Sequence, residues 1–406
     1  MPLDMDLARL ATSALLAWSI VVACVSLEAV RRYGMRMRRA REQSLNRLCG
    51  STQGPDRPEV LLLRPCAGAE PELLRTLRSA RSLFTGGFKL RCVFGLENES
   101  DAALRPAHMA CEELRAHGIR AEVRITHASA PNRKAGQLEA MLQSQSPFKG
   151  VIVVADSDVD LSGLDLDGFI APLFGPDAAK AVWAPPVERT RSNTLGDKAS
   201  AAFLGASLHS FSLLGGLDQG GLVGKLFALQ AQSLEEIGGF GSLTQILGED
   251  MELARRLKAK KGRIVLAPFP ARSLAQGRTF SQAAQRFARW MMMIRTQRPL
   301  LLLSYPALFF ATPLLVLLSL FALPYAPGMA LASLLLALLS RLMVAFTATL
   351  AQGLKPSLFR LFQDVILSDA LLIAAFFHAL RSRRVVWRKH SFSVGANGAL
   401  SGRATP

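Results

Sequence analysis

Two aspartates separated by a single residue, Asp156 and Asp158, directly follow an apolar run at residues 151–155. Carboxylate oxygens bind hard divalent cations, and a cation held by two carboxylates can also hold and neutralise the diphosphate of a nucleotide. The bland alternative is a polar strand end, because residues 158–167 contain several further aspartates. The pair alone therefore leaves two interpretations: a metal site for a nucleotide diphosphate, or an ordinary acidic loop.

A second acidic pair, Glu249 and Asp250, lies directly before a predicted helix at residues 251–260. The helix dipole stabilises acidic residues in the first turn of a helix, so the pair has a purely structural interpretation. A carboxylate beside a metal-bound diphosphate can also act as a general base that removes a proton from an alcohol. Both interpretations stay open from the residues alone.

A third motif, Arg286 and Arg289 followed by Trp290, lies on a predicted helix at residues 281–297, just before a long apolar stretch. Arginines, methionines and a tryptophan on one helix are typical of a membrane interface. We therefore predict an interfacial amphipathic helix at residues 281–298. An arginine also offers two parallel hydrogen bonds to a phosphate.

The segment that contains the first two motifs, residues 58–280, has the pattern of an α/β domain. Short apolar runs alternate there with amphipathic segments, and no run is long enough to span a membrane. Predicted strands lie at residues 60–63, 90–96, 121–126 and 151–155, and predicted helices at 70–84, 102–117 and 133–143. In an open parallel sheet, ligands bind beyond the carboxyl ends of the strands, which is where Asp156 and Asp158 fall.

Residues 10–27 contain no charged side chain and are followed by a cluster of arginines. A cleaved signal peptide has its basic residues before the apolar run, whereas here Asp4 and Asp6 precede it. We predict an uncleaved transmembrane anchor at residues 1–30 and a basic linker at residues 31–57. The positive-inside rule then places the linker and the α/β domain in the cytoplasm.

Two further apolar stretches, residues 300–323 and 329–350, predict a transmembrane helical hairpin at residues 299–350. Pro306 and Pro313 predict a kink in its first helix. Arg341 lies within the second helix, where it must pack against protein or face a polar cavity, and we favour packing.

The last apolar stretch, residues 365–380, is short and contains Asp369 and His378. If it crossed the membrane, the basic tail at residues 381–406 would lie on the side opposite to the first arginine cluster, against the positive-inside rule. We predict a short re-entrant or interfacial segment at residues 351–380, with a complete crossing as the alternative. The chain then has two to three C-terminal membrane helices.

The composition agrees with a membrane protein: half of the 406 residues are hydrophobic and the mean hydropathy is +0.25. Lys and Arg number 48 against 31 Asp and Glu, a net charge of +17. These basic residues cluster beside the apolar runs, which favours an anionic membrane surface over nucleic acid as a partner. The five cysteines have no CxxC spacing, so we expect neither a disulfide framework nor a zinc site.

In their order and spacing, the three motifs resemble those of membrane-bound glycosyltransferases with the GT-A fold. The chain looks most similar to the ceramide glucosyltransferase family, with the bacterial hopanoid glycosyltransferases as close relatives. Further similarities are Arg64-Pro65-Cys66-Ala67-Gly68-Ala69-Glu70, Asn132-Arg133-Lys134, the run from Leu234 to Gly239 and the tail from Val386 to Phe392. The resemblance extends from about Pro58 to Ser393 and implies an α/β, GT-A nucleotide-sugar transferase domain.

The resemblance also implies a role for each matching residue. Asp156 and Asp158 would bind the divalent cation and the diphosphate of the sugar nucleotide, and Asp250 would be the base that activates the acceptor hydroxyl. The residues that would lie around the nucleotide, the diphosphate or the acceptor headgroup are Lys134, Glu249, Arg286, Arg289 and Trp290. His209 resembles the histidine of the family's acceptor-proximal Thr-Ser-His, and a structural histidine is the alternative.

One position departs from the family pattern. Asn98 matches the family's first nucleotide-binding aspartate, and its amide can hydrogen-bond a uracil or ribose edge but supplies no charge. Glu97 or Asp101 can take that role instead. Ala67 also stands where the family's first-strand pattern has a lysine.

We therefore expect the inverting transfer of a hexose from a UDP-sugar to the hydroxyl of a membrane lipid, with ceramide as the first expectation. The alternatives are a hopanoid or a diacylglycerol as acceptor, or a non-catalytic scaffold that binds sugar nucleotides, which Asn98 favours. The expected cofactor is Mg2+ or Mn2+, and the expected partners are the donor, the lipid acceptor and an anionic membrane surface. We expect a bacterial inner-membrane protein with a cytoplasmic catalytic domain; the sequence leaves the sugar and the oligomeric state open.

Overall fold

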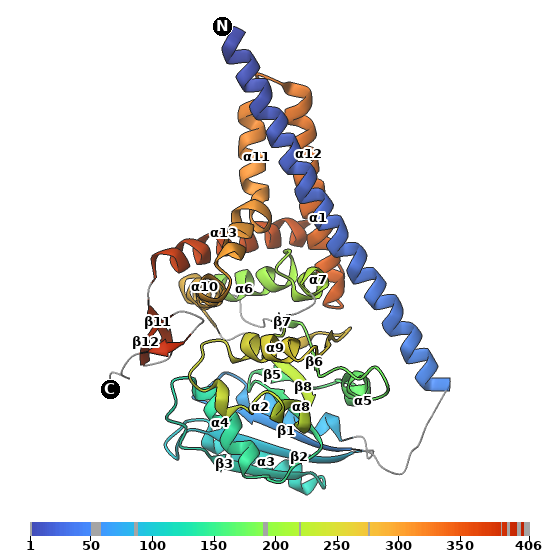
Figure 1. Ribbon diagram of the computed structural model, residues 1–406, viewed down its shortest axis with the longest axis vertical. Coiled ribbons are helices and arrows are strands. Elements are labelled where there is room, and N and C mark those ends of the chain that lie inside the picture. Colours follow the sequence, from blue (N-terminus) through green and yellow to red (C-terminus); the bar gives the residue numbers. More distant parts are fainter. Residues whose placement is uncertain are drawn as a thin grey trace. The chain divides into compact units, whose positions relative to one another are not determined.

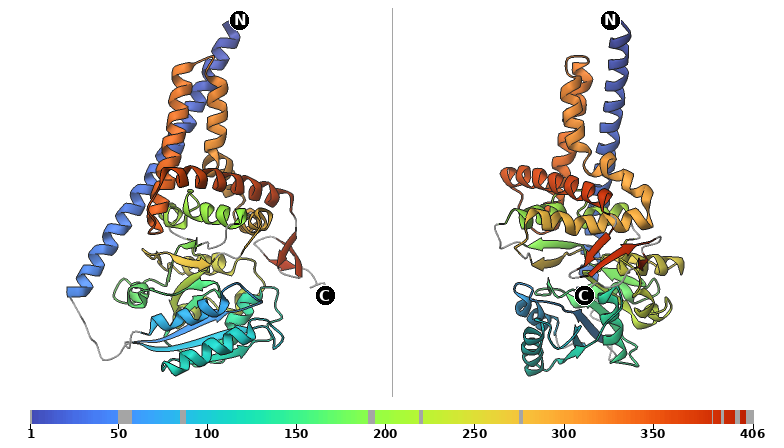
Figure 2. Two further views of the ribbon diagram at one scale, coloured as in Figure 1. Left: turned by 180° about the vertical axis from the view of Figure 1, so that it is seen from behind. Right: turned by 90° about the vertical axis from the view of Figure 1, so that its left-hand side faces the viewer.

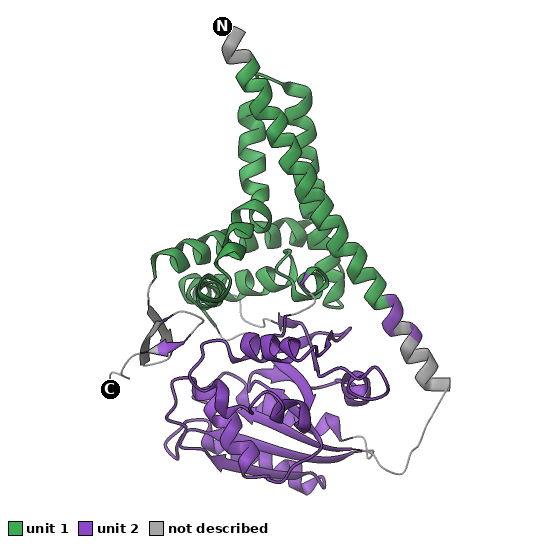
Figure 3. Ribbon diagram, viewed as in Figure 1, with its two compact units in different colours: residues 1–37, 192–217, 277–382 green, residues 38–191, 218–276, 383–406 purple. Residues whose placement is uncertain are grey.

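The chain forms two compact units (Figure 3). Unit 1 contains residues 1–37, 192–217 and 277–382, and unit 2 contains residues 38–191, 218–276 and 383–406. The computed structural model describes residues 2–49, 58–84, 88–189, 194–218, 221–274, 277–382, 384–387, 390–395 and 399–401.

Unit 2 is built on a seven-stranded sheet with the order β3-β2-β1-β4-β8-β6-β9. Its strands are β1 (Glu59–Pro65), β2 (Lys89–Leu96), β3 (Arg120–Ile125), β4 (Val151–Ala155), β6 (Ala181–Trp183), β8 (Leu226–Gln230) and β9 (Ile264–Leu266). Strands β3, β2, β1 and β4 pair with one another in parallel. In their register, Leu62 on β1 lies between Cys92 on β2 and Val153 on β4. All five residues of β4 are buried, as expected for a strand covered on both faces. The strands predicted at residues 60–63, 90–96, 121–126 and 151–155 are confirmed.

The sheet differs from the predicted open parallel sheet at one strand. β8 runs antiparallel to both β4 and β6, so the sheet is mixed. The short sheets of the unit are β5 (Val159–Asp160), β10 (Ala271–Leu274) and β7 (Pro186–Arg189), and β11 (Arg384–Trp387), β12 (His390–Val394) and β13 (Leu400–Ser401). The predicted basic tail lies only partly within the described residues: Arg383, Arg388 and Lys389 fall outside them.

Helices pack against the sheet of unit 2 (Figure 1). They are α2 (Leu73–Arg78), α3 (Leu104–Ala116), α4 (Arg133–Gln143), α5 (Leu166–Ile170), α8 (Ala231–Glu235) and α9 (Glu249–Ala259), with 3-10 turns η1 (Ser79–Leu83), η2 (Ala171–Leu173) and η3 (Gly241–Leu243). On α3, Ala107, Cys111 and Leu114 recur at helical spacing and are buried in the core of the unit. The α/β class predicted for this part of the chain is confirmed.

Three helices run side by side in unit 1: the part of α1 (Pro2–Cys49) up to residue 37, α11 (Ala311–Ala322) and α12 (Pro327–Ala351) (Figure 1). An apolar cluster of Leu15, Val22, Ala311, Leu315 and Ala337 holds them together. Buried hydroxyl groups add hydrogen bonds between the helices, from Ser19 and Ser319 to Ser333. Small residues of this kind let helices approach closely in a membrane.

A second set of helices in unit 1 runs across these three. It contains α6 (Leu195–Gly205), α7 (Phe211–Leu217), α10 (Phe280–Gln297) and α13 (Leu358–Arg381). α13 packs against α10 and α6. In Figures 1 and 2, α13 lies across the direction of α11 and α12.

Among the residues that the structure describes, three helices are long and apolar enough to cross a membrane, at residues 6–40, 327–351 and 358–381. The predicted span at residues 300–323 is instead a broken pair, Pro299–Phe309 and Ala311–Ala322, bent by 50°. Its first part consists of the short turns η4 (Pro299–Leu303) and η5 (Tyr305–Phe309). The predicted kink therefore takes the form of a break at Phe310.

One predicted boundary differs from the structure. α1 stays helical through the arginine cluster to Cys49, so most of the predicted linker at residues 31–57 is part of a helix. α13 starts at Leu358, within the predicted segment 351–380 and ahead of its apolar stretch, because the Ser357 side chain accepts a hydrogen bond from the Arg360 amide and caps the helix. Its 24 residues are enough to span a membrane, although its course across α11 and α12 supports an interfacial position.

Candidate active site

A buried arginine holds the turn that carries Asp156 and Asp158. Arg64, on β1, is fully buried, and its Nη2 donates to the carbonyl oxygens of Asp156 at 2.8 Å and of Val159 at 2.6 Å. Its Nη1 donates to the carbonyl of Thr76 at 2.6 Å. A guanidinium with several rigid donors can hold successive carbonyls in one turn. Arg64 thus shapes the backbone from which both aspartates project.

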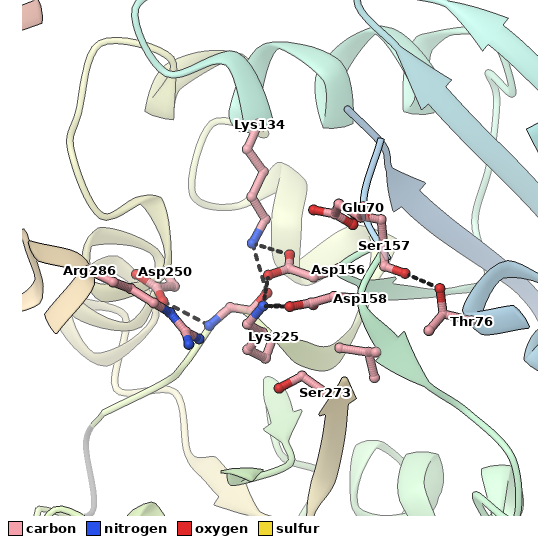
Figure 4. Close-up of polar contacts among 12 residues, drawn as sticks. Glu70, Thr76, Lys134, Asp156, Ser157, Asp158, Lys225, Asp250, Ser273 and Arg286 are labelled. Carbon is pink, nitrogen blue, oxygen red and sulfur yellow. Dashed lines mark hydrogen bonds and ion pairs between the residues drawn. The ribbon is translucent and has the colours of Figure 1, made fainter. Parts of the chain in front are cut away.

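Two lysines face these aspartates (Figure 4). The Lys225 Nζ lies 2.7 Å from both carboxylate oxygens of Asp158 and 3.1 Å from Oδ2 of Asp156. The Lys134 Nζ lies 2.8 Å from Oδ1 of Asp156. Each of the four carboxylate oxygens is therefore in contact with an ammonium group. Lys225 reaches them because it directly precedes β8, the antiparallel neighbour of β4, and its carbonyl accepts from the Asp156 amide.

Lys134 also connects the two acidic pairs. Its Nζ lies 3.2 Å from Oε1 of Glu249, whose Oε2 accepts a hydrogen bond from Asn132 at 3.0 Å. Lys134 and Asn132 lie together at the start of α4, where Asn132 is the N-cap. Glu249 and Asp250 form the first turn of α9, which begins after Gly248 in a left-handed conformation.

Asp250 is held by backbone amides. Its Oδ2 accepts from the Gly224 amide and its Oδ1 from the Met251 amide, each at 2.8 Å. A Cβ atom at Gly224 would lie 3.0 Å from the Lys134 Nζ and 3.2 Å from Asp250, so a larger residue there would require these side chains to shift. The structure thus brings together Lys134, Asp156, Asp158, Glu249 and Asp250 within unit 2.

The charges of this cluster shift its pKa values. Burial, together with the neighbouring Glu249, raises the pKa of Asp250 to about 6. Burial alone would raise the pKa of Asp156, but Lys134 and Lys225 outweigh it and lower that pKa. Burial alone would lower the pKa of Lys134, but Asp156 and Glu249 raise it. Asp250 is therefore the carboxylate whose pKa suits the removal of a proton near neutral pH.

A further carboxylate, Glu70, lies beside the turn. Its Oε2 accepts a hydrogen bond from Ser157 at 2.6 Å. Burial and the charge of Asp158 raise the pKa of Glu70. The sequence assigned Glu70 no role beyond its place in the family-like run that starts at Arg64, and the same is true of Arg64.

The three residues expected near the nucleotide base lie in the loop after β2. Glu97 contacts Arg133 at 3.1 Å, and Asn98 accepts hydrogen bonds from the amide and hydroxyl of Ser100. Asp101 accepts from the amides of Gly68 at 2.7 Å and Ala103 at 2.9 Å. Because β2, β1 and β4 are parallel neighbours, this loop lies at the same sheet edge as Asp156. Asp101 organises the backbone there, and the nucleotide roles of Glu97, Asn98 and Asp101 stay predictions.

The remaining predicted site residues lie in unit 1. On α10 the Arg286 guanidinium lies 5.6 Å from the ring centre of Trp290, and its Nη1 lies 3.3 Å from the Ser200 hydroxyl. Burial and the charge of Arg286 lower the pKa of Arg289. The spacing of Arg286, Arg289 and Trp290 places them on one side of the helix.

His209 is enclosed by aromatic rings in the same unit. Its Nε2 lies 2.9 Å from the Tyr305 hydroxyl, and its ring centre lies 4.6 Å from that of Phe203 and 4.9 Å from that of Phe309. Burial lowers the pKa of His209 to about 4, so the ring is neutral at physiological pH. A packed, hydrogen-bonded ring agrees with the structural alternative for this histidine.

The fit of a divalent cation depends on Asp156 and Asp158. Their oxygens are of the type that Mg2+ and Mn2+ prefer, and Mg2+ is commonly bound by one or two carboxylates together with substrate phosphates. Within the described ranges, no cluster of three or more His, Cys, Asp or Glu side chains is arranged to hold a metal ion. The pair therefore fits a cation whose other ligands come from the donor and water, in the place that the Lys225 ammonium takes here.

Lys225 was not predicted from the sequence. It stands alone before an apolar run, and nothing in that pattern indicates that the strand it precedes pairs antiparallel with β4. Only the sheet order places its side chain over the two aspartates.

Two solved structures are similar to this chain. The mannosyltransferase PcManGT from Pyrobaculum calidifontis, solved with GDP-Man and Mn2+, is 17% identical, with a TM-score of 0.44, covering 90% of this chain and 99% of that one. Glucosyl-3-phosphoglycerate synthase from Mycobacterium tuberculosis, solved with Mg2+ and UDP, is 17% identical, with a TM-score of 0.34, covering 58% of this chain and 78% of that one. No curated protein sequence matches the chain. The family model described as glycosyl transferase family 21 matches residues 11–400, nearly the whole chain, which therefore belongs to this family of glycosyltransferases.

Proposed function

We propose that this glycosyltransferase moves a hexose from a UDP-sugar to the hydroxyl group of a membrane lipid, with ceramide as the acceptor and inversion at the anomeric carbon. The observation that carries the proposal is the arrangement of Asp250. Its carboxylate is held by two backbone amides and has a pKa near 6, and Lys134 separates it from the Asp156–Asp158 pair.

On the donor side, Asp156 and Asp158 would hold Mg2+ or Mn2+, which supplies positive charge to the departing diphosphate. Lys134 would supply a further fixed positive charge at the diphosphate. Asn98, with Glu97 or Asp101, would face the nucleotide at the same sheet edge.

On the acceptor side, Asp250 would take the proton of the lipid hydroxyl. The hydroxyl oxygen then forms a bond to the anomeric carbon while the bond from that carbon to the diphosphate oxygen breaks, and UDP leaves with the bonding electrons. A single displacement of this kind inverts the anomeric configuration, so an α-linked donor gives a β-glycoside. Glu249 would keep the pKa of the base high through its negative charge.

Arg286, Arg289 and Trp290 would close over the diphosphate and the acceptor headgroup. Paired arginines suit a diphosphate because each guanidinium can donate two parallel hydrogen bonds. The contact of Arg286 with the Trp290 ring supports a pre-ordered arrangement of these side chains. His209 would hold Tyr305 in place through the hydrogen bond between its Nε2 and the Tyr305 hydroxyl, which is a structural role.

An enzyme that acts on a membrane lipid must itself be located at the membrane. The three apolar helices and the arginines that follow the apolar part of α1 support an integral membrane protein in a bacterial inner membrane. On that basis the catalytic domain lies in the cytoplasm, where UDP-sugars are made, and the arginines face anionic lipids.

The test is transfer of a radiolabelled sugar by the purified full chain in lipid-containing micelles with Mn2+. UDP-glucose, UDP-galactose and UDP-N-acetylglucosamine serve as donors, each with ceramide, diacylglycerol or a hopanoid as acceptor. We expect labelled β-glucosylceramide with the wild type and with Asp177→Asn, a control at an exposed aspartate outside the motifs, and none with Asp250→Asn. Label in another lipid alone contradicts the ceramide assignment.

A second candidate function is a scaffold that binds sugar nucleotides without transfer. Asn98, in place of the family's aspartate, is the observation in its favour. Donor binding without transfer to any of the three lipids would support the scaffold and exclude the transferase.

A further inference from the structure

Lys225 occupies the position between the two aspartates that a divalent cation would need. Its Nζ contacts both oxygens of Asp158 at 2.7 Å and one oxygen of Asp156 at 3.1 Å. This is the geometry of a cation shared by two carboxylates. The side chains are largely shielded from water, with 14% of Lys225 and 8% of Asp158 exposed.

We propose that Lys225 is an internal cation of the Asp156–Asp158 pair, which competes with the divalent metal for the same oxygens and so makes metal binding depend on the donor. The proposal deepens the proposed function, because it assumes that a metal and a nucleotide diphosphate bind at this pair.

Burial is the first argument for the competition. A buried carboxylate is costly unless a positive charge or hydrogen bonds compensate it. In the free protein Lys225 provides this compensation to Asp158. A divalent ion that contacts the same two oxygens must displace the ammonium, and the free energy of that displacement is subtracted from the affinity for the metal.

The second argument is that the backbone of Lys225 is fixed, whereas its charge lies at the end of a long side chain. The Lys225 carbonyl accepts from the Asp156 amide, which ties the residue to the strand that carries the pair. The four-carbon stem and compact ammonium of a lysine allow the charge to move without moving the backbone.

Charge repulsion is the third argument. Asp156 and Asp158 carry two negative charges, and the ammonium groups of Lys134 and Lys225 both contact them. A divalent cation that enters alone brings two further positive charges next to these two ammonium groups, which repel it. The diphosphate of a nucleotide sugar brings two negative charges, so metal and donor together leave the net charge beside the lysines unchanged. The displaced Lys225 ammonium then has the diphosphate as its new partner.

The experiment measures Mn2+ binding to the purified full chain by the loss of the electron paramagnetic resonance signal of free Mn2+, with and without UDP. For the wild type we expect weak binding of Mn2+ alone and markedly tighter binding with UDP. Lys225→Met should bind Mn2+ alone at least about tenfold more tightly, because it removes a positive charge within contact distance of the metal ligands. The gain in affinity that UDP gives should shrink in this variant.

Three further variants control the result. Lys225→Arg keeps the charge and should keep Mn2+ binding weak. Lys180→Met removes a half-exposed lysine that pairs with Glu236 at 3.0 Å and should behave like the wild type. The double variant Lys225→Met with Asp158→Asn should lose the tighter Mn2+ binding of Lys225→Met. That loss would show that the tighter binding depends on the carboxylate pair.

Unchanged or weaker Mn2+ binding by a folded Lys225→Met protein would overturn the proposal. Lys225→Gln serves as the neutral variant if the methionine variant does not fold, with the thermal midpoint as the measure of folding. Because Mn2+ binding is measured without sugar transfer, failure of transfer to every lipid would reject the proposed function and leave this result standing.

Discussion

Buried charges occur in both units, and they are arranged in opposite ways. In unit 1, Arg341 of α12 meets Asp369 of α13, with Nη2 at 2.8 Å from Oδ1 and at 2.6 Å from the Ser368 hydroxyl. Its Nη1 donates to the carbonyl of Ala206. One cation faces one carboxylate, and neutral acceptors satisfy the other donors. Arg341 is thus packed against protein, as the sequence favoured.

In unit 2, four carboxylates lie close together with only two lysines. Asp156, Asp158 and Glu249 pair with Lys134 or Lys225, while backbone amides hold Asp250. Burial of an excess of like charges costs free energy, and it is retained where a cation or a proton has to be bound. A buried ion pair with balanced charges stabilises the packing of helices. A buried cluster with an excess of negative charge instead indicates a binding or catalytic site.

The largest effect should follow from removal of the base in the unbalanced cluster. Asp250→Asn keeps the size and one acceptor but cannot take a proton, so we expect transfer to fall by about 10²–10⁴-fold. The stability of the folded protein should change little, because the loss of a buried charge near Glu249 offsets the loss of one of the two hydrogen bonds from backbone amides. Initial rates of sugar transfer and the unfolding midpoint in detergent measure the two effects.

Donor binding by Asp250→Asn supplies the control for this prediction. We expect UDP to bind as in the wild type, because the Asp156–Asp158 pair is intact. Loss of UDP binding together with transfer would place Asp250 in donor binding rather than in proton transfer.

The balanced pair should show the reverse behaviour. Asp369→Ala leaves the Arg341 guanidinium buried without its carboxylate, and we expect a loss of about 3–5 kcal/mol in the free energy of unfolding. Unfolding in detergent, followed by circular dichroism, measures this loss.

The double variant Arg341→Met with Asp369→Leu sharpens the comparison. Replacing both charges with apolar side chains of similar size removes the unpaired group, so stability should return to near the wild-type value or exceed it. If the double variant is stable but inactive, the pair does more than brace the helices, and the contrast between the two clusters fails.

The pH dependence of transfer tests the charge excess directly. Asp250 acts as a base only when ionised, and its pKa is about 6, so the rate should rise as the pH increases through about 6. Glu249 raises that pKa, and Glu249→Gln should therefore move the acidic limb of the profile to lower pH. A limb that stays in place would show that Asp250 does not set it. Rates at saturating donor between pH 4.5 and about 8 are the measurement.

The smallest effect should come from the neutral polar contacts of unit 1. Ser333→Ala removes hydrogen bonds to Ser19 and Ser319, and we expect a loss of only about 0.6 kcal/mol, typical for such bonds between membrane helices. Ser13→Ala, at an exposed position of α1, is the matched control. A loss as large as that of Asp369→Ala would mean that hydroxyl groups, not the ion pair, brace this unit.

Much of unit 2 could be predicted from the sequence because its parallel strands are continuous apolar runs. Val151 to Ala155 has no polar residue until Asp156, so both the strand and its carboxyl end were evident. β8 has a similar apolar character, but its antiparallel direction depends on long-range pairing with β4, which no local pattern encodes. The position of Lys225 follows from that direction and was missed for the same reason.

The helix boundaries show a second limit of sequence reasoning. The apolar stretch at residues 365–380 does not include residues 358–364, yet Ser357 caps a helix that includes them. Likewise, the arginines after residue 30 suggested a linker, although arginine is a good helix former and α1 simply continues. The charged residues mark the end of the apolar run. The helix itself ends at a different residue.

The continuity of α1 also changes how its positive charge is distributed. Arg32 and Arg36 lie one turn apart on one face, where they donate to the carbonyls of Gly216 and Ser212 in α7. Gly216 lies in the last turn of α7, where the carbonyl groups carry partial negative charge. Arg31, in turn, pairs with Glu28 at 2.6 Å. Fewer arginines of α1 are therefore at the disposal of lipid headgroups than the sequence suggests, and the adhesion of this segment to an anionic bilayer should be weaker, and less sensitive to salt, than a count of its basic residues implies.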